Sequence, residues 1–540
     1  MKHTLVIVGA GLAGLSAALT AVKNGWTVKL VSSLASERAQ SVMAEGGINA
    51  ALNTKGEEDS PEQHYTDTLT AACGLADPNA VWGMTQAASE LVRSLHHLGV
   101  QFNVTDDDEL DLRNFGGQKK KRTAFAQSDT GKQLMTALID AVRREESAGT
   151  VERFPHHKFR TLLLSGNICG GCTVQDTYTG ELLRFVCDAV LIATGGLHGL
   201  FGDTTGSLAN TGEVTAELFR LGVPMANLEM IQYHPTTVEL GEKRMLLSEA
   251  ARGEGGRLFA LRNGKPWYFM EEKYPELGNL MPRDITAREV WTVSRDYEVF
   301  LDMTELPKEV MEHKLAGLVD DCQTYLHKDI RKEPIPILPG IHYFMGGIQV
   351  DERHRTSMRN LYAAGECCAQ YHGANRLGGN SLLGAIYGGQ IAAETACRET
   401  VSSPNMPCAE ESLLPELSPD AQMQMNRILL NALGVVRDAQ TLEAGIQEIR
   451  KLSGTLPLLA VPCWKVPRPK RKPGCALAGR LSPTPTMPFT AKPPWHTGTG
   501  SISPSALNPS PKGGMIYELH HPNQTAGKPA GFTLLAGVFL

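Results

Sequence analysis

Residues 5–14 read Leu-Val-Ile-Val-Gly-Ala-Gly-Leu-Ala-Gly, in which an apolar run leads directly into three spaced glycines. The apolar run predicts a short buried strand, and residues 15–22 predict a helix after it. Gly9, Gly11 and Gly14 have the spacing at which a strand turns tightly, exposes its backbone to a pyrophosphate and packs closely against the helix. With a second apolar stretch at 27–31, the segment predicts a Rossmann-type β-α-β unit that binds a dinucleotide.

Two more short apolar stretches predict further strands of the same domain. They lie at residues 189–193 and 360–366, far from the first strand in the sequence. Strands that are dispersed in this way can still join one doubly wound sheet. We therefore predict an α/β fold with a discontinuous nucleotide-binding domain at 1–228 and 340–403.

The rest of the chain divides by composition. Residues 229–339 are richer in charged groups, aromatic groups and turns, which predicts an inserted α+β capping domain, and 418–455 has the apolar spacing of a C-terminal helical region. Residues 456–540 hold 15 of the 31 prolines and a single acidic residue. This tail is predicted to be disordered, or to result from a frameshift.

The overall composition excludes some classes of function. The 540 residues are 42% hydrophobic and carry a net charge of −6, which indicates a globular protein and gives no sign of nucleic-acid binding. No segment has the roughly 20 apolar residues that a membrane span needs, and the N-terminus enters a strand without a signal-peptide pattern. We expect a cytoplasmic protein that could reach a membrane only through partners.

The glycine pattern does not choose between NAD and FAD, because the acidic residue usually found about 20 positions later is missing. The second strand instead ends near Ser32, whose hydroxyl could take that place. Residues 41–51, Ser-Val-Met-Ala-Glu-Gly-Gly-Ile-Asn-Ala-Ala, contain paired glycines that let the backbone lie against a flat ligand. This stretch resembles the flavin-contacting segment of the superfamily that contains fumarate reductase, succinate dehydrogenase and L-aspartate oxidase.

Further motifs similar to those of that superfamily follow in the same order, up to about residue 455. They are at 193–196, 232–236, 248–256, 282–284, 342–347, 364–366 and 372–382. The stretch 264–269 resembles the Bacillus-type, menaquinone-linked subfamily. The resemblance implies FAD as the cofactor, bound by Gly9, Ala10, Gly11, Ala13, Gly14, Ser32, Gln40, Ser41, Ala44, Gly46, Gly47, Thr194, Gly195, Glu213, Glu366, Ser381 and Leu382.

One position departs from the succinate dehydrogenase pattern. Those enzymes usually carry a histidine, covalently bonded to the flavin, five positions before the residue that is Glu45 here, and this chain has Gln40 there. A glutamine amide is not a comparable nucleophile, so we predict FAD held without a covalent bond. In this family a tethered flavin favours succinate oxidation, so its loss favours fumarate reduction.

The resemblance also implies a substrate site for a C4 dicarboxylate. His234, Ser248, His342 and Arg376 match the residues that bind the two carboxylates, Arg283 matches the proton donor, and Glu249 and Arg252 match a relay that returns the proton. Arginine suits a carboxylate because its planar fork can pair bidentately. Taken singly, each histidine could be an ordinary core residue and each arginine part of an ion pair.

The residue Phe115 narrows the range of possible substrates. L-aspartate oxidases usually have a glutamate at this position to meet the substrate ammonium, whereas an apolar ring suits an unsubstituted carbon chain. We expect the catalytic subunit of a complex that interconverts fumarate and succinate, with an iron–sulfur subunit and a membrane anchor as partners. An L-aspartate oxidase and a non-catalytic FAD-binding homologue remain as alternatives.

Two conspicuous stretches are interpreted as unrelated to catalysis. Residues 169–172, Cys-Gly-Gly-Cys, have metal-ligand spacing but no second ligand pair nearby, so we predict a glycine turn and no metal site. The basic run 119–122, Lys-Lys-Lys-Arg, could attract anionic substrates, but we interpret it as a solvated surface.

Overall fold

The structure is a computed structural model that describes residues 3–241, 243–401 and 417–452, together with residue 457 and the segments 516–519 and 534–535. Most of the sequence after residue 455 is therefore outside the described residues, and with it the prediction of a disordered or frameshifted tail.

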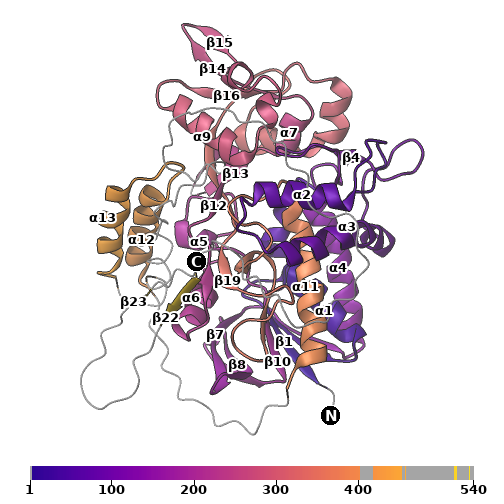
Figure 1. The fold of residues 1–540 in the computed structure, drawn as a ribbon, viewed down its shortest axis with the longest axis vertical. Helices are drawn as coiled ribbons and strands as arrows, with labels where there is room; N and C mark the ends of the chain where they lie inside the picture. Colours follow the sequence, from indigo (N-terminus) through magenta and orange to yellow (C-terminus); the bar gives the residue numbers. More distant parts are fainter. Residues whose placement is uncertain are drawn as a thin grey trace, which may run out of the picture.

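A parallel five-stranded sheet forms the lower part of the molecule as drawn in Figure 1. Its strand order is β20-β10-β1-β2-β6, and every neighbouring pair is parallel. The strands are β1 (Thr4–Val8), β2 (Thr27–Val31), β6 (Val151–Phe154), β10 (Ala189–Ile192) and β20 (Leu361–Ala363). The predicted α/β fold is confirmed, since strands that are dispersed in the sequence meet around β1.

The two faces of this sheet bury alternate residues of β1. Leu5 and Ile7 belong to one hydrophobic core, and Val6 and Val8 belong to the other, as the two-residue period of a strand requires. Helices cover the first face and share its core: α1 (Leu12–Lys23), α3 (Pro78–Leu98), α4 (Thr130–Ser147) and α11 (Asn380–Glu399). A further helix, α2 (Pro61–Ala71), packs against α3.

The second face is covered by an antiparallel sheet of β7 (His157–Ser165), β8 (Ile168–Asp176) and β9 (Leu182–Val186). The prediction of a glycine turn at 169–172 was wrong, because these residues lie inside β8. Gly171 has φ +150°, and a Cβ there would lie 2.0 Å from the Phe185 carbonyl oxygen, so glycine is needed inside the strand. Cys169 and Cys172 are buried in the apolar core.

A two-stranded ribbon leads from the sheet to the upper part of the molecule (Figure 1). It consists of β12 (Ile231–Leu240) and β18 (Leu338–Phe344), and β13 (Lys243–Leu246) adds to β12. The upper part has a hydrophobic core of its own. It contains β14 (Arg257–Arg262), β15 (Lys265–Trp267), β16 (Val299–Asp302), β17 (Ile335–Pro336), α7 (Glu249–Gly253), α8 (Phe269–Lys273), α9 (Arg283–Ser294) and α10 (Ala316–Asp321).

The remaining elements are short or peripheral. They are β3 (Ile48–Asn49), β4 (Leu112–Arg113), β5 (Thr123–Ala124), β11 (Met225–Ala226), β19 (Gly347–Gln349), β21 (Cys368–Ala369), α5 (His198–Phe201), α6 (Glu213–Arg220), α12 (Pro419–Ala432) and α13 (Ala439–Ile449). Within the tail, β22 (Ile516–Leu519) pairs with β11, and β23 (Leu534–Leu535) pairs with β22.

The basic run 119–122 is not a uniformly solvated surface, and that interpretation was wrong for its last residue. Arg122 is fully buried and forms ion pairs with Asp59 at 2.8 Å and Asp67 at 2.9 Å. Asp67 belongs to α2, so the guanidinium fastens that helix to the segment that leads into β5. A buried cation requires such paired carboxylates, because desolvation alone would exclude it.

Candidate active site

A single cavity of about 590 Å³ extends from the glycine turn after β1 to the first residue of α9. It is lined by nearly all of the predicted cofactor-binding residues; of the seventeen, only Gly14 is not in its wall. The predicted substrate-site residues Phe115, His234, Ser248, Glu249, Arg283, His342 and Arg376 line the same cavity, and Arg252 lies behind Glu249. Residues predicted separately as a nucleotide site and a dicarboxylate site thus share one space.

The glycines after β1 have no room for side chains. Gly9 has φ +115°, and a Cβ there would lie 2.1 Å from the Ala193 carbonyl oxygen. A Cβ on Gly14 would lie 1.9 Å from the Gly9 carbonyl oxygen, so this glycine serves the packing of α1 on the strand. The N-terminus of α1 therefore opens onto the cavity with its backbone exposed, which suits a diphosphate.

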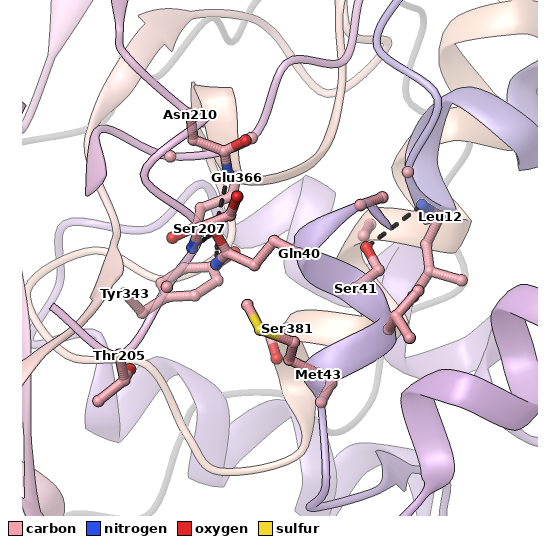
Figure 2. A pocket seen from close by; sticks show the side chains of 18 of the residues that line it. Leu12, Gln40, Ser41, Met43, Thr205, Ser207, Asn210, Tyr343, Glu366 and Ser381 are labelled. Atoms are coloured by element: carbon pink, nitrogen blue, oxygen red, sulfur yellow. Dashed lines mark hydrogen bonds between the residues drawn. The ribbon is translucent and has the colours of Figure 1, made fainter. Parts of the chain in front are cut away.

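Gln40 is fixed by hydrogen bonds at the wall of the cavity (Figure 2). Its Oε1 accepts from the backbone N–H of Ser207 at 3.1 Å and from Asn210 Nδ2 at 2.7 Å. Its Nε2 donates to His198 Nε2 at 2.8 Å and to Glu366 Oε2 at 3.3 Å. His198 Nε2 also lies 3.4 Å from Glu366 Oε1, and its Nδ1 lies 3.2 Å from Thr204 Oγ1.

Three other side chains of the predicted cofactor site form hydrogen bonds to backbone groups. Ser41 Oγ accepts from the backbone N–H of Leu12, the first residue of α1, at 3.4 Å (Figure 2). Ser32 Oγ donates to the Leu34 carbonyl at 2.7 Å, which leaves its lone pairs available to a ligand hydroxyl. Glu366 Oε1 accepts from the Phe344 backbone N–H at 3.0 Å.

A buried chain of three charged side chains runs behind the predicted substrate position. Glu249 Oε2 accepts from Arg283 Nε at 2.9 Å, and its Oε1 accepts from Arg252 Nη2 at 3.0 Å. Burial by itself would raise the pKa of Glu249, but the two guanidinium groups outweigh it and lower that pKa to about 2. The carboxylate is therefore ionised and joins the two arginines.

The two predicted histidines face each other across the ribbon. His234 lies on β12 and His342 on β18, with ring centroids 5.1 Å apart. His342 Nδ1 is hydrogen-bonded to Thr205 at 2.8 Å, and His234 Nδ1 is close to Thr236. Desolvation, followed by the positive charge of Arg283, holds the pKa of both imidazoles well below 6.5, so both are neutral.

Several buried polar side-chain atoms in this part of the cavity have no hydrogen-bond partner among the described residues. They include His234 Nε2 and Arg376 Nε. Burial, followed by repulsion from Arg283, lowers the pKa of Arg376 to about 9, which still leaves it charged at neutral pH. Its guanidinium lies 4.5 Å from the Tyr343 ring centroid. Unsatisfied buried donors are costly, so their presence in a cavity wall indicates a ligand that accepts hydrogen bonds.

The last two predicted substrate residues, Ser248 and Phe115, are positioned by the start of a helix and by the paired glycines. Ser248 precedes α7, its Oγ accepts from the Ala250 backbone N–H at 3.4 Å, and its side chain is also hydrogen-bonded to the buried carboxyl of Glu45. Phe115 is 1% exposed. A Cβ on Gly46 would lie 3.1 Å from the Phe115 ring, which therefore packs directly on the paired glycines.

Sequence reasoning missed some residues of this site. Gln232 is the most important, because its Oε1 accepts from Arg283 Nη1 at 3.0 Å and its Nε2 donates to the Arg376 carbonyl at 2.7 Å. Gln232 therefore joins the two arginines. In the sequence, only its position two residues before His234 could have indicated a role in the site. Thr205, which orients His342, lay in no predicted motif.

The residues present fit an FAD. The cavity combines a glycine cradle too tight for any Cβ, a helix N-terminus that can face a diphosphate, and the flat surface of the paired glycines. Among the described residues, no group of three or more His, Cys, Asp or Glu side chains could hold a metal ion, and no helix is long and apolar enough to cross a membrane.

Similar proteins agree with this geometry. Residues 4–382 match the model of the FAD binding domain family. The succinate dehydrogenase flavoprotein subunit of Bacillus subtilis is 43% identical over 406 residues, which are 74% of this chain and 69% of that one. The L-aspartate oxidase of Streptomyces coelicolor is 33% identical over 83% of this chain and 79% of its own.

Solved structures support the same relationship. A variant of the E. coli quinol fumarate reductase FrdA superposes with a TM-score of 0.75 at 26% identity, over 86% of each chain. The predicted relationship is confirmed: the chain belongs to the FAD binding domain family and, within it, to the family of fumarate reductase and succinate dehydrogenase flavoprotein subunits.

Proposed function

We propose that this chain is an FAD-dependent oxidoreductase that interconverts fumarate and succinate, with Arg283 as the proton donor. The observation that carries the proposal is the charge of the buried cluster. Arg252 and Arg283 are both bonded to the carboxylate of Glu249, and Arg376 adds a third guanidinium to the same buried cluster. The excess of guanidinium groups over bonded carboxylates, beside unsatisfied polar atoms, suits a dicarboxylate dianion.

The side chains divide the work of holding the substrate. Arg376 and the two imidazoles of His234 and His342 bind the carboxylates, with the Ser248 hydroxyl as a further donor. Neutral imidazoles suit this role because each can donate one hydrogen bond without adding to the repulsion among the arginines. Phe115 faces the unsubstituted carbon chain and excludes water.

The reaction adds two hydrogens across the double bond of fumarate. When bound in its reduced form, FAD would supply the hydride to one carbon, so a proton must reach the other carbon. Arg283 lines the cavity and can place an N–H there. A free guanidinium does not release its proton at neutral pH, so the transfer depends on recharging through Glu249 from Arg252, whose distances of 2.9 and 3.0 Å permit a relay.

We further propose that FAD is held without a covalent bond. The amide of Gln40 is already engaged by Ser207, Asn210, His198 and Glu366, and it is not a nucleophile. Because a flavin without a covalent bond favours fumarate reduction in this family, we propose that the chain works mainly in that direction.

We also propose an iron–sulfur subunit and a membrane anchor as partners, which would place the chain at the inner face of the cell membrane. The family relatives named as flavoprotein subunits support this assignment.

The proposal is tested with purified protein that has been loaded with FAD and photoreduced. Addition of fumarate should restore the oxidised flavin absorbance, and Arg283→Leu should abolish this reoxidation while FAD stays bound. Reoxidation at the wild-type rate in the variant would remove Arg283 as the donor. Formation of iminoaspartate and peroxide from L-aspartate, with no response to fumarate, would instead identify an L-aspartate oxidase. No response to either substrate would leave only FAD binding.

A further inference from the structure

A buried glutamine behind the cavity joins two segments of the substrate site. Gln118 is 5% exposed and is not part of the cavity wall. Its Oε1 accepts from the backbone N–H of Phe115 at 3.1 Å, and its own backbone N–H donates to the Phe115 carbonyl at 3.1 Å. Its Nε2 donates to the Gly378 carbonyl at 2.9 Å and to Asn49 Oδ1 at 2.9 Å.

Gly378 packs closely between Phe115 and Glu249, with no room for a side chain. A Cβ added to it would lie 2.9 Å from Phe115 Cβ and 2.8 Å from Glu249 Oε2. It follows Arg376 by two residues, so the position of its carbonyl limits where the guanidinium of Arg376 can lie. The Arg376 carbonyl is itself held by Gln232 at 2.7 Å.

The geometry points to Gln118 as a positioning residue that fixes the spacing between Phe115 and the Arg376 segment, and thereby the affinity of the site for a dicarboxylate. This inference rests on the proposed function of the same cavity. Gln118 touches neither the cavity nor the reacting atoms, and it acts through the two backbone groups that its carboxamide joins.

The hydrogen-bond network explains why the effect should be local. Without the Gln118 carboxamide, the Gly378 carbonyl keeps Asn49 Nδ2 as a donor at 2.7 Å, and Asn49 Oδ1 keeps the Thr123 hydroxyl at 2.6 Å. Phe115 loses the one acceptor that the described part of the chain provides for its buried N–H. An unsatisfied buried donor is costly, so the Phe115 segment should move while the rest of the network persists.

The first test replaces Gln118 by methionine, which has a similar length but no amide. Gln118→Met should weaken binding of malonate, measured from the flavin absorbance change, by about tenfold. It should raise the KM for fumarate by a similar factor and leave kcat and FAD content within about twofold. The matched control Gln101→Met removes an exposed glutamine whose amide reaches only the Gly99 carbonyl, and it should leave both constants unchanged.

A second variant keeps the inference testable if the methionine variant does not fold. In Gln118→Glu, the protonated carboxyl can accept from Phe115 and donate to Gly378, whereas the ionised form cannot donate. Malonate affinity relative to wild type should therefore recover as the pH falls. Wild-type affinity for malonate in either variant at every pH would overturn the inference. A wild-type protein that binds no malonate would overturn the proposed function, and this inference with it.

Discussion

Replacing Glu249 by glutamine would remove the one carboxylate that directly bonds Arg252 and Arg283. The side chain keeps its shape and can still accept from one arginine, but its amide nitrogen then faces the other. The variant therefore isolates the electrostatic contribution of the carboxylate from its volume. Both side chains of each pair are almost fully buried, so solvent screens the interaction little.

The expected loss of stability follows from the pKa of this group. That pKa falls from its ordinary 4.5 to about 2, and each unit corresponds to about 1.4 kcal/mol, so the ionised carboxylate stabilises the fold by about 3 kcal/mol. Because the folded pKa is depressed, this stabilisation is fully present above pH 4.5 and is lost as the pH falls toward 2. The full loss should therefore appear at neutral pH.

The measurement is urea unfolding at pH 7 with saturating FAD. Glu249→Gln should lower the free energy of unfolding by about 3 kcal/mol. The matched control Glu333→Gln breaks an exposed pair with Lys328 at 2.8 Å, and it should cost less than about 1 kcal/mol. Turnover with fumarate should also fall by about 10²-fold or more in Glu249→Gln, since the relay is broken. Equal losses in the two variants would refute the electrostatic reasoning.

Three other outcomes are expected. Acid precipitation should release all FAD, since Gln40 offers no covalent attachment, and a fluorescent band on a denaturing gel would contradict this. The affinity for malonate should show no titration centred near pH 6.5, because burial holds the pKa of His234 and His342 well below that value; a titration there would show that an imidazole is protonated, whereas Glu45 in the same cavity wall, whose pKa burial raises to about 8, would titrate at higher pH. Gly14→Ala should lower the melting temperature and the affinity for FAD, since its Cβ would lie 1.9 Å from the Gly9 carbonyl oxygen, and an unaltered thermal scan would disprove that clash.

Residues whose role depends on local chain geometry could be predicted from the sequence. Gly9 and Gly14 belong to a short pattern that specifies both the turn and the helix packing, and the structure has them in that arrangement. The motif residues His234, His342 and Arg376 were also found in advance, and the structure brings them to one cavity.

Residues that depend on partners far along the chain could not be predicted. Arg122 looked like the end of a basic surface run, and its burial is explained only by Asp59 and Asp67, more than 50 residues away. Gln118 and Gln232 are neutral amides whose partners lie on other segments. Such contacts leave no periodic pattern in a single sequence, because they form only when the sheet and the ribbon bring distant segments together.

The ribbon of β12 and β18 also has a thermodynamic consequence. Arg283 begins α9 of the upper part of the molecule, Arg376 lies four residues before α11, which packs on the parallel sheet, and the two histidines lie on the strands β12 and β18. A dianion bound by Arg376 and the two histidines, with Arg283 beside it, would therefore link these parts of the molecule through non-covalent contacts. By reciprocity, anything that clamps these parts together must tighten the grip on the dianion by the same free energy.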